Sequence, residues 1–321
     1  MISIREAKRR DLAEMMRLHR QASEFQGRLD PRLAPDSGGT DRFRKALQPM
    51  LSGRSDHVFV AQEDDDDGLL GCVIGKVVDN RPFNVLQYGY MSCFYVDEVW
   101  RGQEVGRGLF AAIRDWFKAE GLDTAQVDVS PRNTIGWRFW EKRGFTRFLD
   151  HLYRDTGSGV TRDVKSGVVV RRAEVGDLEA VLSLWEEMME YHAPLDRRLR
   201  VFPGGRAYIA RAIGYWVGDE ASRLLVAEAG DGVIGFALGG LVDTGLGLKP
   251  ATYGHVAHVC VTAKWRRRGI GRQLFARLRG WFQRQGLSSI HIYVSHLSPV
   301  SQCFWRNLGF EDYVERLWCD L

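Results

Sequence analysis

A repeat at an offset of 165 residues limits the possible folds of this chain more than any other feature of its sequence. Six of the ten tryptophans stand in register at this offset. The pairs are Trp100 with Trp265, Trp116 with Trp281, and Trp140 with Trp305. Gly106 and Gly271 stand at the same offset, within two glycine-containing segments of similar sequence. A repeat this long predicts two copies of one domain rather than a solenoid of short units.

The length and composition agree with two globular domains. The chain has 321 residues, of which 45% are hydrophobic and 27% are charged. Each half is long enough to bury a core of its own. We expect domains at residues 1–156 and 168–321, joined at residues 157–167 by a linker rich in polar residues, glycine and serine.

The composition also excludes several classes of protein. The first residues are charged and lack the apolar core of a signal peptide, and no apolar run reaches the ~18–20 residues that span a bilayer. Five cysteines without a C-x-x-C pair argue against a disulfide framework or a zinc site and favour a cytoplasmic location. The net charge is only +4, and positive charge gathers between Arg266 and Arg272, which favours a phosphorylated small molecule over nucleic acid. We therefore expect no metal, no nucleic-acid partner and no membrane partner.

Both units have the same predicted order of elements. Each begins with a short strand ending in Arg and an amphipathic helix that Asp11 or Asp177 would cap. A polar stretch, a pair of strands around an Asp/Gly-rich turn, and a mostly apolar strand at 90–96 or 255–261 follow. A strongly periodic helix comes next, and then a strand, a helix and a last strand.

The segment after the strand at 255–261 has the chemistry of an anion-binding loop. It reads Arg266-Arg267-Arg268-Gly269-Ile270-Gly271 between a predicted strand and a predicted helix. Glycines allow the backbone to approach a phosphate with its N–H groups, and the helix adds the positive end of its dipole. The spacing matches neither the G-x-x-x-x-G-K-[ST] of nucleoside triphosphatases nor the G-x-G-x-x-G of dinucleotide-binding folds. It predicts a cradle for a pyrophosphate.

Two sequence patterns occur together in this chain. Residues 261–271 fit V-x-P-x-x-[RQ]-x-x-G-x-[GA], except that Ala263 replaces the proline. A second pattern, N-x-x-A-x-x-x-Y-x-x-x-G-F, is partly matched by Ser298, Phe304-Trp305 and Gly309-Phe310, and in the first unit by Asn133, Phe139-Trp140 and Gly144-Phe145. In this combination the chain resembles, twice and over nearly its whole length, the GNAT superfamily of acetyl-CoA-dependent N-acetyltransferases.

The resemblance implies an α/β fold of two tandem GNAT-like domains, each a twisted, mainly antiparallel sheet flanked by helices. It also implies acetyl-CoA as cofactor, with CoA as product. The loop would bind the CoA pyrophosphate, the strand before it would pair with the pantetheine arm, and a backbone N–H near Val261 would polarise the thioester carbonyl. The cofactor-binding residues implied for the second unit are Val259, Cys260, Val261, Arg266, Arg267, Arg268, Gly269, Ile270, Gly271, Arg272 and Ser298. Those of the first unit are Arg101, Gly106, Arg107 and Asn133.

The chain departs from the family pattern at two places. In the first unit Glu104 stands where the first glycine belongs, and a carboxylate beside two phosphates costs about a kcal/mol or more at an effective dielectric constant of about 20. The first unit is therefore predicted to be degenerate and the second active, unless Glu104 points to solvent and leaves CoA binding intact. In both units a tryptophan, Trp140 or Trp305, replaces the Tyr that many family members use as an acid, and indole cannot do acid work.

The candidate catalytic groups lie in the second unit. His255 stands six residues before Val261 and would share its face of the strand, which makes it a candidate general base. His258 would face the other way unless the strand bulges. Tyr293 is a candidate acid. Each of the three side chains has the alternative role of packing only.

The leading function is acetyl transfer from acetyl-CoA to a primary amine of a small molecule. Tyr191 and His192 are candidate substrate-binding residues, because in the family this region borders the acceptor pocket; a surface helix end is their alternative role. Protein or peptide N-acetylation and non-catalytic acyl-CoA binding are the alternative functions. The two units are expected to form an intramolecular pseudo-dimer, in a chain that is a monomer or a homodimer. Each last strand, at 146–154 or 312–319, would be covered by the other unit.

Overall fold

The computed structural model describes residues 1–35, 38–51, 56–64, 68–157, 167–230, 232–243 and 252–321. Most of the predicted linker, residues 158–166, lies outside the described residues. Among the described residues, no helix combines the length and apolar character needed to cross a membrane. Nor do three or more His, Cys, Asp or Glu side chains gather there as a metal-binding group.

The elements of the two halves follow one another in the predicted order. The first half contains β1 (Ile2–Glu6), α1 (Leu12–Leu29), η2 (Pro31–Leu33), α2 (Gly39–Met50), β2 (Asp56–Glu63), β3 (Leu69–Asp79), β4 (Gln87–Val96), α3 (Val105–Ala119), β5 (Thr124–Val129), α4 (Thr134–Glu141) and β6 (Thr146–Asp155). The second half contains β7 (Val169–Arg172), α5 (Leu178–His192), η5 (Arg197–Leu199), α6 (Gly205–Gly218), β8 (Ser222–Ala229), β9 (Gly232–Asp243), β10 (Thr252–Val261), α7 (Ile270–Arg284), β11 (Ser289–Ser295), α8 (Pro299–Arg306) and β12 (Glu311–Asp320).

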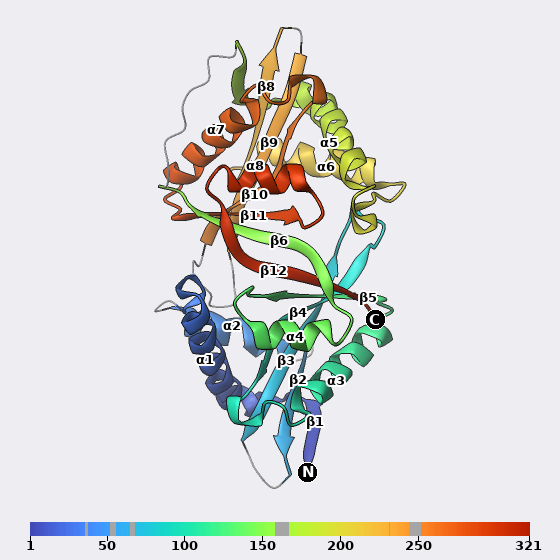
Figure 1. Ribbon diagram of the computed structural model, residues 1–321, viewed down its shortest axis with the longest axis vertical. Coiled ribbons are helices and arrows are strands. Elements are labelled where there is room, and N and C mark those ends of the chain that lie inside the picture. Colours follow the sequence, from blue (N-terminus) through green and yellow to red (C-terminus); the bar gives the residue numbers. More distant parts are fainter. Residues whose placement is uncertain (36–37, 52–55, 65–67, 158–166, 231, 244–251) are drawn as a thin grey trace.

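The described strands form a single mixed sheet that runs through both halves. Its strand order is β1-β2-β3-β4-β5-β12-β6-β11-β10-β9-β8-β7. Only the β4–β5 and β10–β11 pairs among these strands are parallel. The halves lie end to end, with helices on both faces of the sheet (Figure 1). The predicted α/β fold of two similar halves is confirmed.

The two halves exchange their last strands. β12 pairs with β5 of the first half, and β6 pairs with β11 of the second half. The two exchanged strands also pair with each other across the middle of the molecule (Figure 1). As a result the backbone N–H of the last residue, Leu321, donates to the carbonyl of Asp123 in the first half. The last strands are thus joined to the sheet of the other half, which goes beyond the predicted covering.

The exchanged strands also supply the cores. Leu317 and Cys319 of β12 are buried in the cluster that packs α3 onto the first half. Leu152 of β6 is buried in the corresponding cluster beneath α7 of the second half. On the other face of the sheet, α1 and α2 cover the first half and α5 and α6 cover the second. Neither half therefore has a complete core without the last strand of the other.

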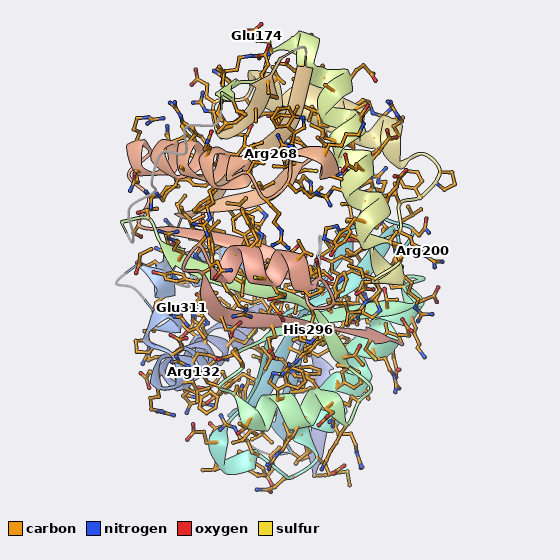
Figure 2. The ribbon with its side chains drawn as sticks, turned by 45° about the horizontal axis from the view of Figure 1, so that its top comes forward. Arg132, Glu174, Arg200, Arg268, His296 and Glu311 are labelled. Atoms are coloured by element: carbon orange, nitrogen blue, oxygen red, sulfur yellow. The ribbon has the colours of Figure 1, made fainter. Side chains whose placement is uncertain are left out.

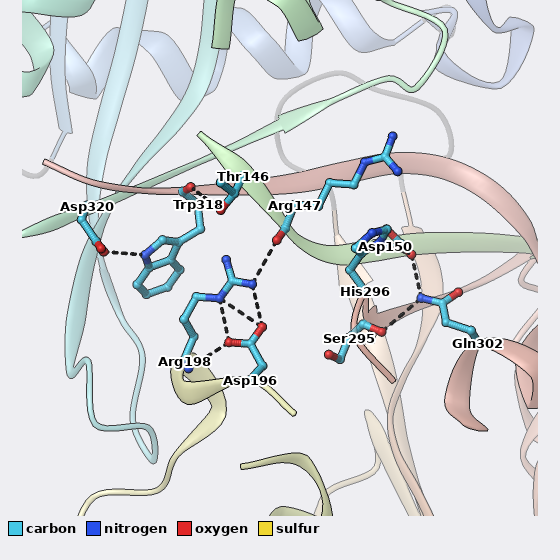
Figure 3. A network of polar contacts seen from close by, with 10 residues as sticks. All are labelled: Thr146, Arg147, Asp150, Asp196, Arg198, Ser295, His296, Gln302, Trp318 and Asp320. Atoms are coloured by element: carbon cyan, nitrogen blue, oxygen red, sulfur yellow. Dashed lines mark hydrogen bonds and ion pairs between the residues drawn. The ribbon is translucent and has the colours of Figure 1, made fainter. Parts of the chain in front are cut away.

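A buried ion pair in each half fixes the exchanged strands. The carboxylate of Asp196 accepts hydrogen bonds from the Arg198 guanidinium, at 2.8 and 2.6 Å. The guanidinium also donates to the carbonyl of Arg147 on β6 (Figure 3). It lies over the rings of Phe148 and Trp318. In the first half Arg32 binds Asp30 in the same way and donates to a carbonyl on β12.

Asp11 and Asp177, the predicted helix caps, form ion pairs with arginines of the preceding strands. Neither carboxylate accepts a capping bond from its α-helix. Instead Asp11 pairs with Arg5 at 2.7 Å, and Asp177 pairs with Arg171 at 2.7 Å. Each carboxylate also accepts from the backbone N–H three residues earlier in the chain. Both residues stand at the predicted N-cap positions. Their side chains form no capping bond, because a strand arginine and a preceding 3₁₀ turn use both carboxylate oxygens.

Candidate active site

The central feature of the site is a gap between two parallel strands. β10 and β11 pair only from Gly254 opposite Ile290 to Val256 opposite Ile292. Beyond Val256, β10 stays paired with β9 as far as Val261, so its other edge is open. The same divergence occurs in the first half, where β4 and β5 pair only as far as Met91 opposite Val127. An extended ligand can therefore add its own hydrogen bonds to each open edge.

The loop that follows β10 has the predicted anion-binding shape. Arg267 and Gly269 adopt left-handed backbone angles, with φ of 66° and 80°, and Gly269 stands at the N-terminus of α7. Such angles turn successive N–H groups into one concavity, and the helix start adds its own N–H groups. The side chains of Arg267, Arg268 and Arg272 are exposed. Arg268 marks the place of this loop beside α7 (Figure 2).

The first-half loop has the same backbone in spite of its different sequence. Gly102 and Glu104 adopt left-handed angles, with φ of 81° and 68°, at the positions equivalent to Arg267 and Gly269. Each loop therefore has one glycine and one strained non-glycine residue, in opposite order. The Glu104 side chain is exposed and forms an ion pair with Arg107. Its charge is at least partly neutralised within the loop.

Each half holds a cleft at its strand gap, and the two clefts differ in size. The first-half cleft has a volume of about 970 Å³ and reaches the loop at Gly102, Glu104, Gly106 and Arg107. The second-half cleft has a volume of about 310 Å³ and meets its loop at Arg266. The half with the poorer loop sequence thus has the larger cleft, so the sequence of the loop does not predict the space beside it.

Comparison with known proteins identifies the family. The model of the acetyltransferase (GNAT) family matches residues 15–145 and again 183–310, which together make up most of the chain. The chain belongs to the GNAT acetyltransferase family. Enzymes of this family use acyl-CoA and an acceptor substrate. No curated protein matches this GNAT chain.

Solved structures share the fold over the whole chain. A GNAT from Sphaerobacter thermophilus is 17% identical with a TM-score of 0.64, covering 99% of this chain and 94% of its own. A tandem GNAT protein of clavulanic acid biosynthesis is 13% identical with a TM-score of 0.58, covering 99% and 97%. The glucosamine N-acetyltransferase region of a fungal GH3 β-N-acetylglucosaminidase is 18% identical with a TM-score of 0.61, covering 99% of this chain but 38% of the fungal one.

A bulge in β10 changes the positions of the two candidate histidines of this GNAT chain. The register of β10 against β9 shifts between Val256 and His258. Val256 packs in the cluster beneath α7, and Val259 and Val261 pack against that same cluster. His255 alternates with Val256 and so faces the α5 side of the sheet. The prediction that His255 shares a face with Val261 was wrong, because the bulge interrupts the two-residue period.

His258 and His255 differ in their access to the second-half cleft. His258 lines this cleft, on the α5 side, where its ring meets Phe236 at 6.4 Å. His255 is not among the described residues that line either cleft, and its ring stands edge-on to Tyr293 at 5.9 Å. Burial lowers the pKa of His258 to about 4, and burial together with the charge of Arg316 lowers that of His255 to about 4. Both rings are neutral at pH 7.

Tyr293 lies where the two clefts meet. It lines both clefts, together with Tyr88 and Arg316. Its hydroxyl accepts a hydrogen bond from Arg316 at 2.9 Å, and its ring stacks on His151 at 4.3 Å. Burial raises the pKa of Tyr293, so the phenol keeps its proton. The hydroxyl can therefore act as a donor to a group in either cleft.

The sequence analysis missed the polar groups around Tyr293. Arg316 donates two hydrogen bonds to Asp128, at 2.7 and 2.8 Å, and Tyr90 donates a third at 3.0 Å. The repeat offset was a usable signal, because Asp128 is the counterpart of Tyr293 and His151 is the counterpart of Arg316. The strand exchange then brings Arg316 directly opposite Asp128 and His151 opposite Tyr293.

Four further residues predicted from the sequence lie in or beside the clefts. Tyr191 and His192 line the second-half cleft, and the Nδ1–H of His192 donates to the carbonyl of Met188 at 2.8 Å. Asn133 lines the first-half cleft and accepts from the N–H of Gly136 as the cap of α4. Ser298 is fully buried, and its hydroxyl donates to Ser301, which does line the second-half cleft.

Proposed function

We propose that the chain transfers an acetyl group from acetyl-CoA to the primary amine of a small molecule, in the cleft of its second half. The observation that carries the proposal is the combination of the open edge of β10 with the arginine-rich loop at its end. His258 lies on the same strand and lines the same cleft. The fungal relative, a glucosamine N-acetyltransferase, also acts on a small-molecule amine.

The residues of the second half fit acetyl-CoA. The concave backbone at Arg267 and Gly269, with three exposed arginines, suits a pyrophosphate. Arg266 is held by the carbonyl of Val261 at 2.8 Å and by Glu187 at 3.0 Å, so it orders the turn into the loop. The backbone of residues 259–261 provides the edge for the pantetheine arm. When bound, acetyl-CoA supplies the activated acetyl group as a thioester.

His258 is the proposed proton acceptor of the reaction. An amine must lose a proton to form an amide, and a neutral imidazole beside the open edge of β10 can accept it. The lowered pKa keeps His258 unprotonated throughout the neutral range. His255 is the alternative base, and it would need a water molecule to reach the cleft. The backbone N–H groups near Val261 remain the proposed donors to the thioester carbonyl.

Tyr293 is the proposed donor to the departing sulfur. Its proton is retained because burial raises its pKa, and the hydrogen bond from Arg316 fixes its oxygen. A thiol has a pKa of about 8.5, so the thiolate is a moderate leaving group that needs a hydrogen bond rather than full protonation. Another residue must supply this donor, because Trp305 replaces the Tyr that many family members use and an indole cannot act as an acid.

The first-half cleft favours a second role. Its volume of about 970 Å³ and its contact with the loop from Gly102 to Arg107 favour acyl-CoA binding without transfer. Against tight binding, Glu104 brings a carboxylate to the loop and occupies Arg107. We expect the first half to bind acetyl-CoA more weakly than the second.

Calorimetry together with an assay of thiol release tests the proposal. We expect one tight acetyl-CoA site per chain, and release of free thiol only when an amine is present. Gly271→Glu should abolish both, because its Cβ would lie 3.2 Å from the ring of Phe304 and its charge would oppose the phosphates. Gly280→Glu adds the same charge to the same helix away from the loop, and it should change neither.

Binding of acetyl-CoA to the first half can be tested separately. Glu104→Gly should strengthen a second, weaker site. Two equal sites in the unaltered chain would show that Glu104 does not disturb the loop. Tight binding of acetyl-CoA with no thiol release for any amine would show that the chain binds acetyl-CoA without transferring its acetyl group.

A further inference from the structure

The wall of the second-half cleft is built by both halves. The hairpin between β3 and β4 of the first half extends to the segment after η5. There the N–H of Asn84 donates to the carbonyl of Arg200 at 2.8 Å, and the N–H of Phe202 donates to the carbonyl of Pro82 at 3.1 Å. A β-bridge joins Phe83 to Val201 between these bonds. The hairpin is therefore fixed to the second half by its backbone.

Phe83 brings an aromatic ring to this cleft. It packs against the cluster formed by Phe148, Leu199 and Trp318 at the junction of the halves. It also lines the cleft, together with Asn80 of the same hairpin. A side chain from the first half thus forms part of the wall of the proposed transfer site in the second.

The wall of the second-half cleft is largely apolar around Phe83. The apolar side chains that line the cleft include Phe83, Phe148, Leu149, Met188, Met189 and Leu199. Among the described residues that line this cleft, the charged ones are Arg266 and Arg316, and no Asp or Glu is present. The first-half cleft differs, because Glu104, Asp128 and Asp243 line it.

The absence of a lining carboxylate restricts the acceptor. The reacting amine must be uncharged when it attacks, so it needs no anionic partner. A second ammonium group on the same molecule would remain charged, and a buried charge without a partner is costly. The two lining arginines are already paired with Asp128 and Glu187, and they provide no anionic partner for such a group. A flexible thioether and aromatic wall instead favours an apolar body.

We infer that the acceptor of the second half is a monoamine with an apolar or aromatic body and no second positive charge, and that Phe83 of the first half selects for this body. The inference rests on the proposed acetyl transfer in the second-half cleft. It names a chemical class and gives the first half a part in the specificity of the second.

A matched pair of amines tests the charge rule. Hexylamine and 1,6-diaminohexane have the same chain length and differ by one ammonium group. With the full-length protein and acetyl-CoA, we expect kcat/KM for hexylamine to exceed that for the diamine by roughly 100-fold, the size of effect that an unpaired buried charge produces. Equal values, or a preference for the diamine, would overturn the inference.

Two substitutions and one control variant test the role of the cleft wall. Phe83→Ala should raise KM for hexylamine by roughly tenfold, the effect of one lost apolar contact, and leave KM for acetyl-CoA unchanged. Leu86→Ala removes an exposed apolar side chain from the same hairpin and should leave both KM values unchanged. Met188→Glu, which adds a carboxylate to the wall, should shift the preference towards the diamine and keeps the test valid if Phe83→Ala does not fold.

The outcomes separate the inference from the proposed function. Spermidine and glucosamine complete the panel as a polyamine and a polar amine. Rapid acetylation of either, with hexylamine left unchanged, would preserve acetyl transfer and refute the acceptor class. Equal effects of Phe83→Ala and Leu86→Ala would remove Phe83 from the specificity. No acetylation of any amine, with acetyl-CoA binding intact, would refute the proposed function itself.

Discussion

Replacing Arg198 by alanine should destabilise the whole chain, because this arginine neutralises a buried carboxylate where the halves meet. The Asp196 side chain is 3% exposed and that of Arg198 is 13% exposed. In the variant Asp196 keeps one hydrogen bond, from the backbone N–H of residue 198, and loses those from the guanidinium. Removing one partner of a buried ion pair costs about 3–5 kcal/mol. The lost bond to the carbonyl of Arg147 adds to that figure.

The neighbouring residue provides a matched control. Arg197 pairs with Asp320 at 3.2 Å, but the two side chains are 76% and 63% exposed. An exposed pair contributes about 0–1 kcal/mol, so Arg197→Ala should have little effect on the free energy of unfolding. Arg198→Lys keeps the charge but loses the planar two-point contact, and it should give an intermediate loss.

Urea unfolding, together with hydrogen exchange of β6 and β12, measures both effects. We expect the midpoint of Arg198→Ala to fall well below that of Arg197→Ala. Amides of both exchanged strands should exchange faster in Arg198→Ala, because the guanidinium contacts β6 and lies over a ring of β12. If the two variants unfold at the same urea concentration, the buried pair does not stabilise the junction and the reasoning from burial is wrong.

Three further predictions follow from the structure. Leu317→Ala should lower the free energy of unfolding by about 2–5 kcal/mol, since Leu317 is fully buried beside α3 of the first half. It should also speed hydrogen exchange in α3, and faster hydrogen exchange in the second half alone would contradict the exchange of strands. His258→Ala should lower kcat/KM by about 10²–10⁴, whereas the pH–rate profile of the unaltered enzyme should show an acid limb near pH 4. If only His255→Ala causes this loss, His255 is the general base. Burial lowers the pKa of His19 to about 4 in the folded chain, against about 6.5 in the unfolded chain. The unfolded chain therefore binds the proton first as the pH falls, so roughly 3 kcal/mol of the free energy of unfolding that is present above pH 6.5 is lost towards pH 4. In denaturation measured at several pH values, His19→Phe should weaken this dependence, and an unchanged dependence would show that His19 does not cause it.

Local patterns were sufficient to predict the elements and the family. The strand predicted at 90–96 is the end of β4, which begins at Gln87, and the strand predicted at 255–261 lies within β10. Hydrophobic periodicity and glycine placement are properties of short segments, so a single sequence carries them. The loop motif is local in the same sense, and both of its copies adopt the expected turn before a helix.

The strand exchange could not be predicted in this way. β6 and β12 have similar apolar patterns, and either strand could pair with β5 or with β11 on hydrophobicity alone. The choice depends on contacts distant in sequence, such as Arg198 with the carbonyl of Arg147, and pattern analysis does not detect these. The bulge at the middle of β10 was missed for a related reason: one extra residue reverses every later side chain, while the composition of the strand stays the same.

The exchange has a consequence for how the two copies differ. Each cleft includes side chains from strands of the other half: Tyr253 of β10 lines the first, and Gln126 of β5 lines the second. Arg316 belongs to the second copy by the repeat, yet it forms its ion pair with Asp128 of the first and lines both clefts. Its counterpart His151 stacks on Tyr293 of the second half. We therefore expect a substitution in the last strand of either copy to alter the cleft of the other copy as well.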